Sequence, residues 1–231
     1  MIQTFAEKII EFNKNIKYTG VLPPDFSVIN PFEHHPETVK VMQQFYERFY
    51  NDTRSRKFII GINPSRHGAA ITGIPFTDTK RLEEFCGIEM ESARTHEVSS
   101  VFYYDMIDAY GGVDLFYQDF YINSPLPLAL VRQKKDGKIL NANYYDTSEL
   151  FNSLSGFMIE FLSKQFDFGL NQSEVIVLGV KNAGFIKKLN EQGQLFDQMT
   201  ILEHPRYIQQ YKFKERHLYI DKYVKALKGL K

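Results

Sequence analysis

The alternation of apolar and polar residues along the chain predicts helices that are separated by short buried strands. Apolar residues recur at helical spacing in residues 3–17, 37–50 and 148–165, which predicts an amphipathic helix over each segment. Continuous apolar runs at 58–62 and 174–180 are typical of strands that are covered on both faces. Both kinds of element therefore occur along the whole chain.

Three less regular segments complete the pattern. Residues 199–205 are interpreted as a short strand, residues 98–104 as a further strand, and residues 115–123 as a strand or extended chain. Strands that alternate with helices build a mostly parallel sheet with helices on both faces. We therefore predict an α/β fold with three layers, α/β/α, around a central, mostly parallel sheet of about four strands.

The length of 231 residues suits a single domain that spans 1–231. We expect N-terminal helices within residues 1–50 to pack on this domain and a basic helix at 207–231 to close the chain. Only the polar, turn-rich segment 130–145 is expected to be poorly ordered.

Composition limits the classes of function. A single cysteine, Cys86, excludes an internal disulfide and any site of four cysteines for zinc or an iron–sulfur cluster, so we expect neither metal nor cofactor. No apolar run approaches the roughly 20 residues of a membrane helix, and charges interrupt the N-terminal apolar residues, unlike in a secretory signal. We expect an intracellular monomer without a membrane partner, cytoplasmic or, in a eukaryote, nuclear.

The net charge is zero, but the charges are unevenly distributed. Residues 205–231 carry eight Lys or Arg residues and two acidic residues, a net charge of +6, so the preceding chain carries −6. A basic face of this kind suits a phosphate backbone. A solvent-exposed amphipathic helix would give the same pattern, so charge alone leaves both interpretations open.

Polar side chains follow three of the predicted strands. Asn63 comes after the run at 58–62, His204 lies at the end of the last strand, and Asn123 follows an aromatic-rich extended segment. In open sheets of this type, ligands bind at the carboxyl ends of the strands. We therefore expect the three side chains to converge on one pocket.

Asn63 precedes a proline, which favours an extended backbone. Its uncharged amide can hold a water molecule but can hardly deprotonate it. That suits an electrophile that becomes very reactive as its leaving group departs, such as an oxocarbenium-like sugar carbon. A purely structural turn at Asn63-Pro64 is the alternative.

Phe76 and His204 also have two interpretations each. Phe76 lies in a loop with Gly68, Gly73 and Pro75, where the backbone can approach a ligand and the ring can stack on a base, but it is also one of twenty phenylalanines and could belong to the core. His204 can donate a hydrogen bond to charge that develops on a leaving group, or it can cap a neighbouring carbonyl.

The segment GINPSRHGAAITGIPF, residues 61–76, resembles motif 1 of the uracil-DNA glycosylase superfamily. The interval from Asn63 to Phe76 is that of the single-strand-selective monofunctional type. The resemblance implies that Asn63 positions the attacking water and that Phe76 stacks on the extruded base. Three further residues are implied to bind the base: Gly61, Ile62 and Ser65.

Two later segments occur in the order of this family. EHPRYIQQYK, residues 203–212, is similar to the start of motif 2 and implies that His204 hydrogen-bonds the oxygen at position 2 of uracil as negative charge builds there. FYINSPLPL, residues 120–128, is similar to the middle segment and implies that Asn123 recognises the pyrimidine edge. Mismatch-specific relatives have an interval one residue shorter and Asn in the place of His204.

The chain departs from the family pattern at two places. Ser65 stands where Gly is usual, which changes the polarity of the pocket floor, and motif 2 continues Arg206-Tyr207 in place of Ser-Pro. The resemblance then implies a DNA contact surface from both motifs: Pro64, His67, Pro205, Arg206, Tyr207 and Lys212.

The resemblance implies a monofunctional DNA glycosylase that hydrolyses the N-glycosidic bond of uracil or a related damaged base, in single- or double-stranded DNA, and leaves an abasic site. The motifs contain no lysine that could form a Schiff base, so we expect no strand cleavage. Three alternatives stay open: a catalytically weak or silent nucleic-acid-binding module, a glycosylase for another lesion such as hypoxanthine, and a hydrolase of free nucleosides or nucleotides.

Overall fold

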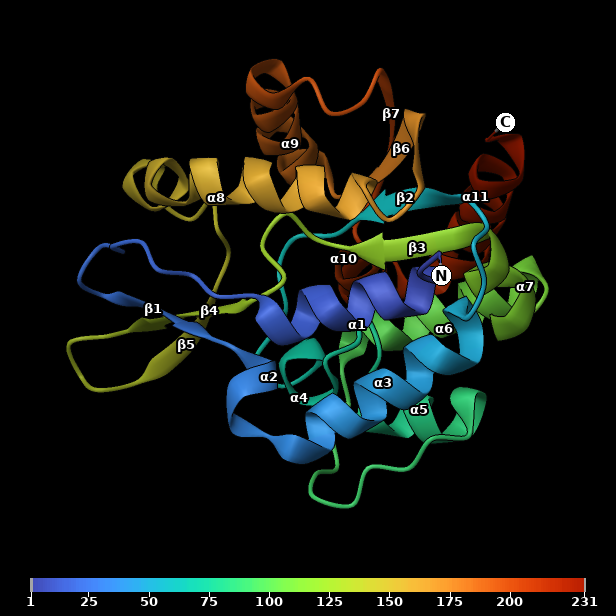
Figure 1. Ribbon diagram of the computed structural model, residues 1–231, viewed down its shortest axis with the longest axis horizontal. Coiled ribbons are helices and arrows are strands. Elements are labelled where there is room, and N and C mark those ends of the chain that lie inside the picture. The colour runs from blue at the N-terminus through green and yellow to red at the C-terminus, as the bar shows by residue number, and fades with distance from the viewer. Residues whose placement is uncertain (1, 231) are drawn as a thin grey trace.

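The computed structural model describes residues 2–230 and has a four-stranded sheet at its centre (Figure 1). The strands lie in the order β3-β2-β6-β7 and every neighbouring pair is parallel. Their bounds are β2 Arg56–Ile60, β3 Phe120–Asn123, β6 Leu170–Leu178 and β7 Gln198–Leu202. Because all four strands run in one direction, their carboxyl ends meet at one edge, as the predicted α/β fold requires.

Helices cover both faces of this sheet, which confirms the three-layer α/β/α fold. Helices α8 (Ser148–Phe166) and α9 (Val180–Gly193) pack on β6, and α7 (Val113–Asp119) contacts β2 and β3. Figure 1 shows α8 and α9 on one side of the sheet, with α3 (Pro36–Tyr50) and α5 (Thr79–Cys86) on the other.

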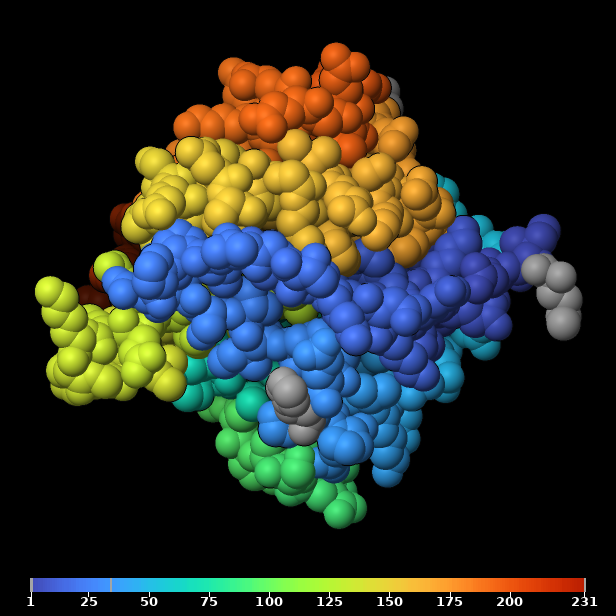
Figure 2. Space-filling model, turned by 60° about the vertical axis from the view of Figure 1, so that its left-hand side comes forward, coloured from blue at the N-terminus to red at the C-terminus, as the bar shows by residue number. Residues whose placement is uncertain are grey.

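The N-terminal segment packs along one side of the molecule. Helix α1 (Phe5–Asn15) starts with a capping box between Thr4 and Glu7 and packs against α3. The ring of Phe12 lies 5.3 Å from that of Phe161 on α8, measured between ring centroids. Figure 2 shows this segment, in blue, between α8, in yellow, and the region around α5, in green.

A second, smaller sheet includes most of the segment that was expected to be poorly ordered. Strands β1 (Phe26–Ile29), β4 (Ala129–Gln133) and β5 (Ile139–Ala142) pair antiparallel in the order β1-β4-β5, and the short helix α2 (Pro31–His34) follows β1. The prediction that 130–145 is poorly ordered was wrong. Gly137 closes the β4–β5 hairpin with a φ of 81°, and pairing with β1 satisfies the backbone of β4 on its other side.

The strand predicted at 98–104 was wrong as well, because this segment starts helix α6 (Val98–Tyr110). The helix is buried on most of its circumference, so its apolar residues lack the one-sided spacing of a surface helix. Residues 115–119 likewise belong to α7, and the extended chain begins only at Phe120.

The basic C-terminal segment forms two helices in place of the one predicted. Helix α10 (Pro205–Tyr211) packs on α6, and a 3₁₀ turn, η1 (Phe213–Glu215), leads into α11 (Arg216–Gly229). The break falls at Lys212, whose φ of −124° and ψ of 25° are not helical. No helix within residues 2–230 is long and apolar enough to cross a membrane.

Strand β2 begins with a buried charge. Arg56 is only 1% exposed, and its guanidinium forms hydrogen bonds with both carboxylate oxygens of Asp52, at 2.9 and 3.0 Å. The same group lies over the rings of Phe5 and Tyr50, 4.7 and 4.6 Å from their centroids. This cluster ties α1 and α3 to the amino end of the central strand.

Candidate active site

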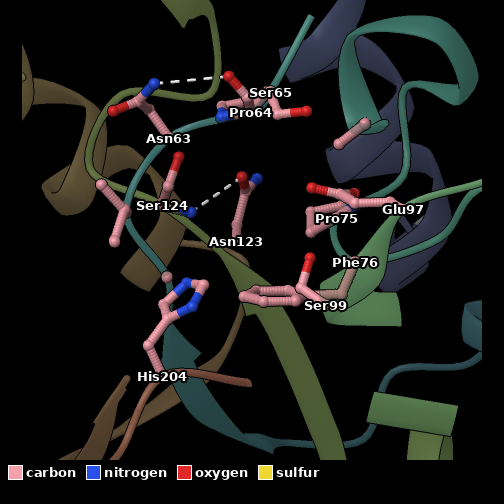
Figure 3. A pocket seen from close by; sticks show the side chains of 13 residues that line it. Asn63, Pro64, Ser65, Pro75, Phe76, Glu97, Ser99, Asn123, Ser124 and His204 are labelled. Carbon is pink, nitrogen blue, oxygen red and sulfur yellow. Dashed lines mark hydrogen bonds between the residues drawn. The ribbon is translucent and has the colours of Figure 1, made fainter. Parts of the chain in front are cut away.

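The carboxyl ends of β2, β3 and β7 border one cavity of about 60 Å³ (Figure 3). By the criterion that a water molecule occupies roughly 10–15 Å³, this volume holds several waters or one flat ring. Asn63, Asn123 and His204, which the sequence places after three strands, all lie on it. The lining consists of Gly61, Ile62, Asn63, Pro64, Ser65, Ala69, Pro75, Phe76, Glu97, Ser99, Asn123, Ser124 and His204.

Asn63 is held by the last residue of β5 and by the chain that follows it. Its Nδ2 donates hydrogen bonds to the carbonyl oxygens of Ala142, at 3.0 Å, and Pro64, at 3.3 Å. Its Oδ1 accepts a hydrogen bond from the N–H of Tyr144 at 3.2 Å. These partners orient the amide and leave one lone pair of Oδ1 for a water molecule.

Asn123 ends β3 and is buried. Its Oδ1 accepts from the N–H of Ser124 at 2.9 Å, and its Nδ2 donates to the hydroxyl of Tyr121 at 2.6 Å. One acceptor site and one N–H of the amide are therefore left for another molecule. The hydroxyl of Ser124, which also borders the cavity, has no hydrogen-bond partner among residues 2–230.

Phe76 has a left-handed backbone, with a φ of 55°. This conformation costs a residue other than glycine of the order of 1–3 kcal/mol, so the surroundings must hold it. The ring stacks on Tyr103, with centroids 4.8 Å apart. The ring also meets Gly61, where a Cβ would lie 3.1 Å from Cε2 of Phe76, so glycine at 61 gives the ring its place.

The carboxyl end of β2 has a buried support that the sequence analysis did not single out. Asn182 of α9 donates hydrogen bonds to the carbonyl oxygens of Gly61, at 3.1 Å, and Leu178, at 3.2 Å. Its Oδ1 accepts from the hydroxyl of Tyr144. Asn182 thus connects the ends of β2 and β6 to the same segment that holds Asn63.

His204 lies at the amino end of α10, two residues after the end of β7. Its Nδ1 accepts from the N–H of Arg206 at 3.2 Å, so Nε2 carries the proton in the neutral ring. Burial, followed by the positive charge of Arg206, lowers the pKa of His204 to about 4. Near neutral pH, the ring is therefore an uncharged donor, 5.5 Å from the ring of Phe76 between centroids.

Glu97 and Ser99 also line the cavity, although the sequence analysis did not select them. Glu97 precedes the first residue of α6. Burial raises the pKa of its carboxyl group, and the hydroxyls of Ser99 and Ser65 and the charge of Arg206 partly oppose this rise. A helix buried on most sides lacks one-sided apolar spacing, so the sequence predicts no helix start at Glu97.

The residues expected to contact DNA lie in different settings. Pro64 lines the cavity, while His67, Arg206 and Tyr207 are exposed near it on the two motif segments. Pro205 is buried as the first residue of α10, so it starts the helix and presents little surface. Lys212 is partly exposed and forms an ion pair with Glu215 at 3.3 Å.

Within residues 2–230, no group of three or more His, Cys, Asp or Glu side chains is arranged to hold a metal ion. The chemistry available at the cavity is therefore that of two amides, one neutral imidazole, one carboxyl group and several hydroxyls.

Comparison with known proteins agrees with this geometry. A family model described as the uracil DNA glycosylase superfamily matches residues 47–228. The chain is similar to the crystal structure of wild-type SMUG2 from Pedobacter heparinus, with 46% sequence identity over 98% of each chain and a TM-score of 0.95. No curated protein matches the chain. The chain belongs to the uracil DNA glycosylase superfamily and is a DNA glycosylase, a hydrolase whose substrate is DNA.

Proposed function

We propose that the enzyme is monofunctional and hydrolyses the N-glycosidic bond of uracil, or of a closely related base, to leave an abasic site. The observation that carries this proposal is that Asn63 and His204 border the same cavity as Phe76 and Asn123. Figure 3 shows the ring of Phe76 beside His204, with Asn63 farther along the same cavity. A base that stacks on Phe76 would have its sugar next to the water-binding amide and the imidazole.

Phe76 would bind the extruded base by stacking. Removal of a nucleotide from the base stack costs a few kcal/mol, and one aromatic stacking contact supplies about 1–3 kcal/mol. Because Tyr103 and Gly61 already fix the ring, little conformational freedom is lost when a base arrives.

Asn123 would distinguish uracil from cytosine. Its Oδ1 is oriented by the N–H of Ser124, and the amide keeps one acceptor and one donor. Uracil presents a donor at N3 and an acceptor at O4, which match this pair. Cytosine presents the opposite pair, so its binding would leave buried polar groups unpaired at a cost of about 1–3 kcal/mol each.

His204 and Asn63 would then assist the two halves of the reaction. As the glycosidic bond breaks, the electron pair moves to the base, and the Nε2–H of the neutral His204 ring donates to the oxygen at position 2. Water held by Oδ1 of Asn63 adds to the sugar carbon and releases its proton to solvent or to the departing base. The described lining of the cavity contains no lysine, which supports hydrolysis without a Schiff base.

The strand next to the lesion would lie on α10. Arg206 and Tyr207 directly follow His204, and the exposed rings of Tyr207 and Tyr211 have centroids 5.7 Å apart. Such rings offer stacking surfaces for bases beside the flipped nucleotide. They stand in place of the Ser-Pro continuation that is usual in motif 2.

Labelled oligonucleotides that contain uracil, 5-hydroxymethyluracil or hypoxanthine test this function. Alkaline cleavage after incubation reports abasic sites, while cleavage without alkali would contradict a monofunctional enzyme. Asn63→Ala and His204→Ala should each lower the single-turnover rate about 100- to 1000-fold with little change in DNA affinity. Asn152→Ala and His217→Ala, at exposed positions on α8 and α11, are the matched controls. Wild-type rates in both site variants would disprove the assigned roles.

Salt dependence tests the DNA surface separately. Arg206→Ala should weaken DNA binding irrespective of sequence and lower the slope of log affinity against log salt concentration by about one. An unchanged slope would remove α10 from the proposed interface and leave the roles in the cavity unaffected.

A further inference from the structure

Glu97 brings an acidic side chain into the cavity that the mechanism above does not use. Figure 3 shows its carboxyl group pointing into the cavity, on the side away from His204 and Asn63. A Cβ on residue 68 would lie 2.0 Å from Oε2 of Glu97, so Gly68 provides the space for this group. The motif 1 loop is therefore shaped around the Glu97 carboxyl.

Several polar groups surround this carboxyl group. The hydroxyls of Ser99 and Ser65 lower the pKa of Glu97, and Ser65 is the residue that replaces the usual glycine of motif 1. The negative charge of Asp78 raises the pKa of Glu97, and the positive charge of Arg206 lowers it. Asp78 accepts the N–H of Glu97 at 2.7 Å.

Two more charged or titratable groups face Asp78, and one faces the cavity. Arg81 lies 3.6 Å and His96 3.9 Å from Oδ2 of Asp78. His204 lies across the cavity from Glu97. Its pKa is about 4, so the ring is neutral at higher pH. Burial is the largest influence on Glu97 and favours its uncharged form.

The charge of the leaving group gives a reason for Glu97 to be uncharged. A base that departs with the electron pair of the glycosidic bond is an anion, and an ionised carboxylate in the same small cavity would repel it. A protonated carboxyl group removes this repulsion and supplies an O–H donor. A base in the cavity also displaces water, which disfavours the ionised form further.

We propose that Glu97 is a specificity-determining residue that acts in its protonated form and donates a hydrogen bond to the edge of the base remote from the sugar. Bases with a carbonyl oxygen on that edge are accepted, and bases with an amino group there are disfavoured. This inference rests on the proposed glycosylase function of the cavity.

Single-turnover rates on uracil-containing DNA, measured across the pH range in which the protein stays folded, test the proposal. The wild-type rate should fall as pH rises and Glu97 ionises. Glu97→Gln, which stays an uncharged donor, should keep the low-pH rate and lose the alkaline decline. Glu97→Ala should be about 10- to 100-fold slower than wild type at low pH. Glu191→Gln, at an exposed position on α9, should follow the wild-type profile.

Ser65→Ala provides a second variant that leaves the carboxyl group in place. Its hydroxyl lowers the pKa of Glu97, so its removal should move the alkaline decline to higher pH. A merely structural role of Ser65 would change the rate at every pH alike. An unmoved decline in Ser65→Ala would overturn the proposal.

The proposal is also overturned if Glu97→Gln is as slow as Glu97→Ala, or if it keeps the alkaline decline. Binding of an uncleavable 2′-fluoro-2′-deoxyuridine oligonucleotide should weaken with rising pH in wild type and not in Glu97→Gln. If Asn63→Ala and His204→Ala lose activity while the Glu97 variants behave like wild type, only the role of Glu97 fails. If none of these variants differs from wild type, the proposed function fails with it.

Discussion

The two ends of strand β2 use polar side chains in opposite ways. At the amino end, all five N–H groups of Arg56 are engaged, with Asp52 and with the carbonyl oxygens of Phe49, Arg54 and Tyr117. At the carboxyl end, Asn63 keeps hydrogen-bonding capacity that the fold does not use. The first arrangement stabilises the native state, and the second is available to a ligand.

The largest expected effect is a loss of stability when Arg56 is removed from the amino end of β2. Arg56→Met should lower the free energy of unfolding by about 3–5 kcal/mol, because several buried carbonyl oxygens and Asp52 lose their partner. A value near 3 kcal/mol is expected because Asp52 is partly exposed and can be solvated. Urea denaturation measures the change, and Arg54→Met, at a side chain 54% exposed, is the control.

The folded fraction of Arg56→Met should excise its base at the wild-type rate, since Arg56 lies at the opposite end of β2 from the cavity. If the folded Arg56→Met protein lost more of its excision rate than Arg54→Met, the two ends of β2 would be coupled. The amino end would then serve catalysis as well as stability.

The next largest effect concerns protonation of His204, which lies near the carboxyl end of β7. His204 has a pKa of about 4 in the folded protein and about 6.5 in an unfolded chain. Above the unfolded value both states are neutral, so the group adds no pH dependence there. As pH falls from about 6.5 to about 4, the unfolded chain gains the proton first, and the free energy of unfolding drops by up to about 3 kcal/mol.

His204→Gln removes this titration without removing a polar side chain. Urea denaturation of both proteins at several pH values should show a wild-type stability that declines more steeply towards acid. Parallel curves would mean that His204 has the same pKa in the native state as in the unfolded chain, and the lowered pKa assigned to it would be wrong.

A smaller effect is expected where Gly61 meets Phe76. Gly61→Ala would place a Cβ 3.1 Å from Cε2 of Phe76, so the ring must shift by a few tenths of an ångström. We expect a cost of about 1 kcal/mol, expressed as a five- to tenfold loss of excision rate with nearly unchanged stability. Gly184→Ala on α9, where no atom lies within 4 Å of the added carbon, should leave the rate unchanged. Equal excision rates for Gly61→Ala and Gly184→Ala would argue against a fixed position of the Phe76 ring.

The position of the ligand site at the carboxyl ends of the strands was predictable from sequence. The apolar runs of β2 and β6 identified buried strands, and the carboxyl ends of parallel strands meet at one edge, so Asn63, Asn123 and His204 were expected to converge. The structure places all three on one cavity. Strand ends are therefore a strong sequence signal for where a site lies.

The remainder was hidden for physical reasons. Helix α6 is buried on most sides, so its residues carry no period that distinguishes a helix from a strand, and Glu97 at its start had no context. Arg56 belongs to a sequence, NDTRSRK, in which three basic side chains look alike, and only packing decides which one is buried. Asn182 lies within a helix, where the partners of a polar side chain come from distant segments.

The smallest effect tests how the carboxyl end of β2 is supported. The hydroxyl of Tyr144 donates to Oδ1 of Asn182, which in turn holds the carbonyl oxygen of Gly61. Tyr144→Phe leaves that buried acceptor unpaired, so stability should fall by about 1 kcal/mol. The rate should fall only a few-fold, because the N–H of Tyr144 that orients Asn63 belongs to the backbone and is kept.

Tyr145→Phe is the matched control for this variant. Tyr145 is adjacent and its ring stacks on Phe185, with centroids 5.0 Å apart, so the change removes a hydroxyl without removing a ring contact. Urea denaturation and single-turnover excision of both variants separate the two functions of residue 144. If Tyr144→Phe lost as much activity as Asn63→Ala at little cost in stability, the hydroxyl would itself serve the reaction. Asn182 would then belong with the side chains whose hydrogen bonds serve the ligand, and not with Arg56.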